Sequence, residues 1–269
     1  SLLNGDLDGL LLTSRYSRHY AAEFDIAEGV AVITKQGSRY FTDSRYIESA
    51  QKNIQGMEVL MVDREHSYFS RINDAIADLG IKTLGFEEAY LTVAEFRGYE
   101  ENLKAKLVPS QASINRFRYT KEPQELDLMR KAQDITDKAF TEVLTKIHAG
   151  MTEKDLLAEL IYCLYKNGAD GLSFDPIVVS GPNTSMPHGV PSDAVVREGD
   201  FITMDFGCIK DGYCSDMTRT VAVGYATDEM KNVYDIVLRA QLAGIARAAA
   251  GVTGAEIDGA ARKVISDAG

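Results

Sequence analysis

The stretch EGDFITMDFGCIKDGYCSDMTRTVAVG, residues 198–224, places an acid inside an apolar run and repeats that placement eleven residues later. The two acids are Asp205 and Asp216. Alternating apolar residues predict one strand over 201–208 and a second over 213–222, with the residues KDG as the turn between them. The sequence therefore predicts an antiparallel hairpin with one acid on each strand.

The parity of the hairpin loop decides whether the two acids face the same side. Directly opposed residues of an antiparallel hairpin have a constant index sum, and a loop with an even number of residues makes that sum odd. Every even loop therefore puts Asp205 and Asp216 on one face, either opposite each other or one diagonal apart. That face also holds Thr203 and Thr218. A three-residue loop would separate the acids.

Two carboxylates on one face need a partner or solvent. At a separation of about 5 Å they repel by roughly 3 kcal/mol at an effective dielectric constant of about 20. A bound cation, a shared proton or exposure to water would each relieve this repulsion. The pattern alone leaves these alternatives open and makes Asp205 and Asp216 candidate metal ligands.

His188 is a further candidate for the same site. It stands in the segment SMPHGVPSD, a loop with prolines and a glycine that comes just before the strand bearing Asp205. Loops of this kind often carry functional residues, and histidine changes its charge near neutral pH. The sequence shows no phosphate-binding glycine motif and no GxSxG nucleophile motif.

The composition limits the classes of partner. The chain has 269 residues, 45% of them hydrophobic, and a net charge of -11 with its basic residues scattered. Nucleic-acid binding needs clustered basic residues, so nucleic acid is not expected as a partner. No apolar run approaches the roughly 20 residues that span a bilayer, and we expect a cytoplasmic protein without a membrane partner.

The first 115 residues alternate strand-like and helix-like segments, which predicts an α/β domain. One expected helix begins with a capping box formed by Thr92 and Glu95. The expected strands cover 7–13, 29–34, 38–42, 57–62 and 81–86, and the expected helices cover 43–53, 66–79 and 92–104.

A second domain is expected over residues 116–269, after a segment in which periodicity lapses. It should begin with a long amphipathic helix that ends at Gly150, followed by a helix capped at Thr152. The segment AGMTEKDL at 149–156 matches AGVTGAEI at 250–257, which indicates an internal repeat with an offset of 101 residues. The second copy starts near 228, and the sequence stops where its strands should begin, so we expect a fragment.

The motifs FDPIVVSGPNTSMPHG, EGDFITMDFG and GYCSDMTRTVAVG resemble the motif series of the pita-bread metallopeptidases. The resemblance is to the branch of Xaa-Pro aminopeptidases and Xaa-Pro dipeptidases (prolidases). The segments YFTDSRYIESAQ and LGFEE are similar to the creatinase/prolidase N-terminal domain. The resemblance implies an α/β N-terminal domain followed by an α+β pita-bread domain, here incomplete.

It also implies a hydrolase with two divalent ions and an activated water. In that reading Asp205 binds one ion, Asp216 bridges both, and His188 contacts the substrate and stabilises the tetrahedral intermediate. Thr218 would orient Asp216 from behind the metal ligands. Carboxylate ligands favour Mn²⁺ first, with Co²⁺, Zn²⁺ or Fe²⁺ as alternatives. The substrates would be short proline-containing peptides, and the protein a homodimer.

The resemblance implies that one His and two Glu ligands follow Gly269. We therefore expect residues 1–269 alone to bind metal weakly and to lack peptidase activity. Methionine aminopeptidase, creatinase and a non-catalytic binding protein on the same fold are the alternatives. The creatinase-like first domain disfavours the first, and the retained acids disfavour the other two. The sequence does not choose between aminopeptidase and dipeptidase.

Overall fold

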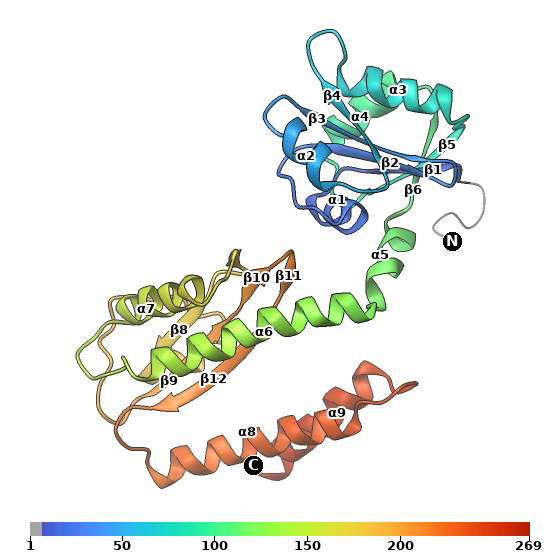
Figure 1. Cartoon of the computed structure of the whole chain (residues 1–269). Coiled ribbons are helices and arrows are strands. Elements are labelled where there is room, and N and C mark those ends of the chain that lie inside the picture. The colour runs from blue at the N-terminus through green and yellow to red at the C-terminus, as the bar shows by residue number, and fades with distance from the viewer. Residues whose placement is uncertain (1–6) are drawn as a thin grey trace. The chain divides into compact units, whose positions relative to one another are not determined.

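The computed structural model describes residues 7–269, and the chain divides into two compact units, residues 1–124 and 125–269 (Figure 1). Residue 115, the expected domain boundary, lies within the helix α5 (Gln111–Tyr119). The last helix of the first unit therefore continues beyond that residue.

The first unit is built on one six-stranded mixed sheet with the order β4-β3-β2-β1-β5-β6. Strand β2 is antiparallel to both β1 and β3, and the other neighbours are parallel. The strands are β1 (Gly9–Leu12), β2 (Val30–Thr34), β3 (Ser38–Asp43), β4 (Glu58–Val62), β5 (Thr83–Phe86) and β6 (Lys106–Pro109). The helices besides α5 are α1 (Arg15–Ala22), α2 (Ile47–Asn53), α3 (Tyr68–Asp78) and α4 (Val93–Asn102).

Helices cover both faces of this sheet. In β1, Leu11 is buried in a core that includes Ile72 of α3. Leu10 and Leu12 point to the other face and are buried in a core that includes Ile114 of α5. A strand buried on both faces has to be apolar throughout, which explains the run of three leucines. The predicted α/β class of this unit is confirmed.

Three elements of the first unit were not predicted. The helix α1 follows β1, and its sequence RYSRHYAA has few apolar residues from which a periodicity could be read. Strand β6 follows the expected helix 92–104 without a predicted counterpart, and helix α5 lies in the segment where the periodicity lapses. Both are short, and tertiary packing rather than local pattern stabilises them.

The second unit combines two small sheets with long helices. The sheet that carries the candidate site has the order β12-β9-β8, and a second sheet has the order β11-β10-β7. The strands are β7 (Gly171–Leu172), β8 (Ile177–Ser180), β9 (Phe201–Phe206), β10 (Cys208–Lys210), β11 (Tyr213–Cys214) and β12 (Met217–Ala222). The helices are α6 (Pro123–Leu144), α7 (Glu153–Lys166), the 3₁₀ helix η1 (Gly181–Ser185), α8 (Asp228–Arg247) and α9 (Gly254–Asp267).

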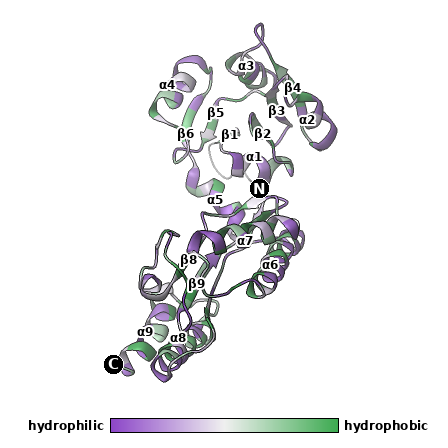
Figure 2. Ribbon diagram, turned by 90° about the vertical axis from the view of Figure 1, so that its left-hand side faces the viewer, coloured by the Kyte–Doolittle hydropathy of each residue, from purple (hydrophilic) through white to green (hydrophobic). Residues whose placement is uncertain are grey.

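Helices α6 and α7 cover one face of the β12-β9-β8 sheet. Both helices carry hydrophobic and hydrophilic stretches side by side (Figure 2). Ile135 of α6 and Leu160 of α7 share one buried core with Met204 and Phe206 of β9. Helix α6 ends at Leu144, six residues before the predicted end at Gly150, and a turn follows it.

The second helix pair repeats the first. Helix α9 begins and ends 101 residues after α7, and the two have the same length. Capping boxes open both helices, with Thr152 and Asp155 in α7 and with Thr253 and Glu256 in α9. The two helices therefore stand at the offset of 101 residues that the sequence pattern gives. Within residues 7–269, no helix is both long and apolar enough to cross a bilayer.

Candidate active site

The register of the β9–β12 hairpin places the two acids on one face. Thr218 lies directly opposite Asp205, and β10 and β11 continue the same index sum. The loop has two residues, Asp211 and Gly212, with φ of 49° and 80°. Positive φ at both loop residues is the requirement of a type I′ turn, which joins twisted strands closely. Asp216 stands two residues before Thr218, so the acids are one diagonal apart, in one of the two arrangements that an even loop allows.

The acids lie on the face that α6 and α7 leave uncovered. Met204 and Phe206 are fully buried beneath the helices, whereas Thr203 and Asp205 alternate with them and are partly exposed. Asp216 is exposed. An apolar face packed on helices therefore fixes the strand, and its opposite face presents the carboxylates to solvent.

Hydroxyl groups surround Asp205 as the sequence predicted, but one of them has a different partner. Thr218 Oγ1 donates a hydrogen bond of 2.7 Å to Asp205 Oδ1. Thr218, which was expected to orient Asp216, lies opposite Asp205 in this register and bonds to that acid instead. The hydroxyls of Thr203 and Thr220 bond to each other at 3.0 Å on the same face.

Neither acid has a cationic partner among residues 7–269. Across residues 7–269, the ion pairs closer than 4.0 Å include neither Asp205 nor Asp216. Within that range the carboxylates therefore stand together without a Lys, Arg or His to offset their charge. Oxygen donors of this kind suit hard or borderline divalent cations.

The two acids stand as a pair and not as part of a larger cluster among the described residues. In the described part of the chain, no group of three or more His, Cys, Asp or Glu side chains is arranged to hold a metal ion. The acid pair fits a divalent metal in its chemistry, since it offers charged oxygens and an orienting hydroxyl on Asp205. Two carboxylates alone would not fill the usual coordination number of such an ion.

Between the two acids, the backbone at Gly207 packs closely against the backbone at Ser215 on the opposite strand. A Cβ atom on Gly207 would lie 2.0 Å from the carbonyl oxygen of Ser215. That oxygen also accepts a 2.9 Å hydrogen bond from Ser173 Oγ. The buried hydroxyl of Ser215 bonds to Thr136 of α6 at 2.6 Å and accepts from the Cys208 N–H at 2.9 Å.

This network links Asp216 to the helix layer, since Ser215 is its neighbour in the chain. The prediction from sequence did not identify Gly207, Ser215 or Thr136 as parts of the site. The available signal was the pair of small residues beside the acids, in DFGC and YCSD. Small residues inside a strand often mark a close backbone approach.

The loop that carries His188 lies on the same side of the sheet as the acids. A Cβ on Gly189 would lie 2.7 Å from Val179 Cγ1, so the loop backbone packs directly on Val179. Val179 pairs with Thr203 and shares its face. His188 is exposed, and among the described residues no hydrogen bond joins it to Asp205. The structure therefore places the His188 loop on the acid face, without a hydrogen bond between His188 and Asp205.

Two family models match the chain. Residues 2–120 match the creatinase/prolidase N-terminal domain, and residues 127–269 match metallopeptidase family M24. The M24 match contains both acids and the His188 loop. The first match agrees with the unit built on the six-stranded sheet.

Individual relatives give the same result. The chain is 38% identical over 264 residues to the uncharacterized peptidase YqhT of Bacillus subtilis, a match that covers 98% of this chain and 74% of the relative. The structure of this chain is similar to that of an Xaa-Pro dipeptidase from Bacillus anthracis, with 39% identity and a TM-score of 0.92 over 98% of this chain and 74% of that one. It is also similar to an X-Pro aminopeptidase from Thermotoga maritima, with 35% identity and a TM-score of 0.93 over 98% and 76%. The chain therefore belongs to metallopeptidase family M24 and carries a creatinase/prolidase N-terminal domain.

Proposed function

We propose that the protein is a metal-dependent exopeptidase that hydrolyses the Xaa-Pro bond at the N-terminus of short peptides or of dipeptides. The observation that carries this proposal is the pair of Asp205 and Asp216 on one face of the hairpin, away from the helix layer. The names of the relatives support the substrate class, since they include an Xaa-Pro dipeptidase and an X-Pro aminopeptidase. Short proline-containing peptides are the proposed substrates.

Two divalent ions are the proposed cofactor, with Mn²⁺ as the first candidate and Co²⁺, Zn²⁺ or Fe²⁺ as alternatives. Asp205 and Asp216 would hold these ions through their carboxylate oxygens. When bound, such ions would lower the pKa of a bound water and polarise the scissile carbonyl. The hydrogen bond from Thr218 fixes the carboxylate plane of Asp205, which keeps its oxygens oriented for this task.

His188 is the proposed substrate-contacting residue. Its imidazole can donate a hydrogen bond to the oxygen on which negative charge develops when water adds to the carbonyl. The packing of its loop on Val179 supports this role, because it holds His188 on the side of the sheet where the acids lie. The exposure of His188 leaves its ring accessible to a peptide.

A cytoplasmic location and a homodimeric state complete the proposal. The net charge of -11 disfavours binding to nucleic acid, because its phosphates carry charge of the same sign. Sedimentation of the purified protein would measure the oligomeric state independently of its activity.

The proposal is tested with the protein expressed from its whole gene, assayed with Ala-Pro and Ala-Pro-Ala in each of Mn²⁺, Co²⁺, Zn²⁺ and Fe²⁺ and after chelation. We expect metal-dependent release of alanine from at least one of the two peptides. Cleavage of the dipeptide alone would identify a dipeptidase, and cleavage of the tripeptide would identify an aminopeptidase. Cleavage of neither peptide in any of the four metals would contradict the proposal and favour a binding protein.

A further inference from the structure

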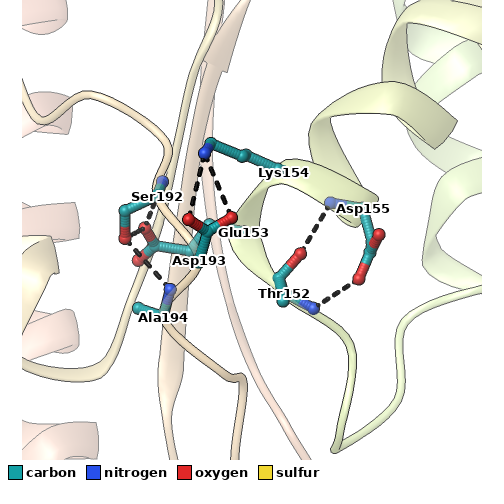
Figure 3. Close-up of polar contacts among 7 residues, drawn as sticks. All are labelled: Thr152, Glu153, Lys154, Asp155, Ser192, Asp193 and Ala194. Atoms are coloured by element: carbon teal, nitrogen blue, oxygen red, sulfur yellow. Dashed lines mark hydrogen bonds and ion pairs between the residues drawn. The ribbon is translucent and has the colours of Figure 1, made fainter.

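A further acid, separate from Asp205 and Asp216, is buried where α7 begins. Glu153 is the first residue of α7, and its side chain is fully buried. Its Oε1 accepts hydrogen bonds from the Ser180 N–H at 2.7 Å, from Ser180 Oγ at 3.2 Å and from Asn183 Nδ2 at 3.0 Å. Its Oε2 accepts from the Ser192 N–H at 2.9 Å and from Ser192 Oγ at 2.7 Å. Figure 3 shows Glu153 beside Ser192, at the start of α7.

The two oxygens of the Glu153 carboxylate accept hydrogen bonds from opposite ends of the loop that carries His188. Ser180 is the last residue of β8, Asn183 lies in η1 directly after it, and Ser192 stands beyond the middle of the segment between β8 and β9. His188 lies between these two groups of donors. One carboxylate therefore ties the entry and the exit of the His188 loop to each other and to the helix.

The hydrogen bonds that hold Glu153 come from neutral donors. In the part of the chain that the structure describes, its carboxylate has no ion pair, and the adjacent Lys154 reaches Asp193 instead, at 3.0 Å (Figure 3). Burial raises the pKa of Glu153, but hydrogen bonds from Asn183, Ser192 and Ser180 outweigh this effect and lower the pKa below its ordinary value of 4.5. The carboxylate is therefore charged at neutral pH, and the groups that hold it belong to the loop.

Between these anchor points, the backbone hydrogen bonds that the structure describes are local. The Met186 N–H donates to the carbonyl of Asn183, and the Gly189 N–H donates to the carbonyl of Met186. These contacts shape turns within the loop but do not attach it to another element. At the exit, the Lys154 N–H donates to the carbonyl of Ser192, which fixes the end of the loop to α7. The carboxylate of Glu153 connects this fixed exit to the entry.

We propose that Glu153 is a positioning residue for His188. Its carboxylate holds both ends of the 181–192 loop, and so presents the His188 imidazole on the face of the sheet that carries Asp205 and Asp216. The proposal rests on the proposed function, because Glu153 would position His188, the proposed substrate-contacting residue of that site. Its effect on the reaction passes through His188 and not through contact with the substrate.

The test compares Glu153→Gln with a matched control, Asp155→Asn. In Glu153→Gln, the new side-chain amide group would face loop donors that need an acceptor. Asp155 accepts a hydrogen bond of 2.8 Å from the Thr152 N–H, at the same end of the helix. Asp155→Asn therefore perturbs that helix end without releasing the clamp. Should Glu153→Gln fail to fold, Asn183→Ala and Ser192→Ala each remove one side-chain hydrogen bond to the carboxylate, a smaller change.

Two readouts do not depend on activity. Amide hydrogen exchange over residues 181–192 should become at least about tenfold faster in Glu153→Gln and stay at the wild-type rate in Asp155→Asn. The NMR signal of the His188 ring should shift in the first variant only. Wild-type exchange and an unshifted His188 signal in Glu153→Gln would overturn the proposal.

A double-mutant cycle separates positioning from a merely structural role. In the whole-gene protein, Glu153→Gln should lower kcat by about 10- to 100-fold, with a smaller change in KM. In a His188→Ala background the same substitution should lower kcat little further, because the imidazole that Glu153 positions is already absent. An equal loss in both backgrounds would refute the role. Full activity of His188→Ala would instead refute the proposed role of His188, while the exchange data would still decide whether Glu153 holds the loop.

Discussion

Replacement of Gly207 by alanine should disrupt the close packing of Gly207 against Ser215 in the hairpin that carries Asp205 and Asp216. The added methyl would lie 2.0 Å from the Ser215 carbonyl oxygen and 2.5 Å from Ser173 Oγ. Ser173 can rotate its hydroxyl away, but the Ser215 oxygen belongs to the backbone of the hairpin itself. Relief therefore requires a shift of the strand that leads into Asp216.

The expected cost follows from this geometry. Overpacking of a dense interior costs about 1–3 kcal/mol, and a contact this short with backbone belongs at the upper end. A loss of about 3 kcal/mol should lower the melting temperature of a unit of this size by about 10 °C. The free energy of unfolding is measured by chemical denaturation in the presence of a chelator, so that metal binding does not contribute.

Gly259→Ala is the matched control. Gly259 lies in α9, and nothing stands within 4 Å of the position that a Cβ would take. Alanine there should raise helix stability by up to about 1 kcal/mol. The reasoning would be refuted if Gly207→Ala unfolded at the same denaturant concentration as the wild type, or if the two variants behaved alike.

Three further predictions concern hydrogen bonds of the second unit. Thr218→Val should weaken Mn²⁺ binding, measured by calorimetry, and lower kcat/KM in the peptide assay by about 10- to 100-fold. The control Thr220→Val removes a hydroxyl bonded to Thr203 and should reduce both quantities much less. Equal losses in the two variants would contradict the role of Thr218. Thr136→Val should lower the free energy of unfolding by about 1–3 kcal/mol, because it leaves the buried Ser215 hydroxyl without this partner, and an unchanged denaturation midpoint would count against it. Because folding lowers the pKa of Glu153, the charged carboxylate stabilises the fold above the unfolded-state value of 4.5, and this stabilisation is lost as the pH falls through the folded-state pKa. The difference in unfolding free energy between wild type and Glu153→Gln should therefore shrink on acidification. A difference that stays constant would contradict this.

The hairpin could be predicted because its geometry depends on parity. The residues KDG indicated a turn, and any even loop puts Asp205 and Asp216 on one face. Parity alone did not distinguish a direct pair from a diagonal one. The structure has the diagonal arrangement, and this register is also why Thr218 bonds to Asp205 rather than to Asp216.

The parts that could not be predicted depend on contacts between distant segments. Helix α5 is short and contributes Ile114 to a core made by β1 and β2, so its local periodicity carries little information. Glu153 in the first turn of a helix is typical of an acid that faces the helix dipole. Its actual hydrogen-bond donors come from 27 to 39 residues further along the chain, and no local pattern indicates them.

The metal content of the protein expressed from its whole gene tests the central claim, that Asp205 and Asp216 bind divalent metal. After exposure to Mn²⁺ and dialysis, we expect about two ions per chain in the wild type and a loss of bound metal in Asp216→Asn. The control is Asp211→Asn, in the turn of the same hairpin, where asparagine tolerates the positive φ and the metal content should not change. Equal manganese content in wild type and Asp216→Asn would contradict the account.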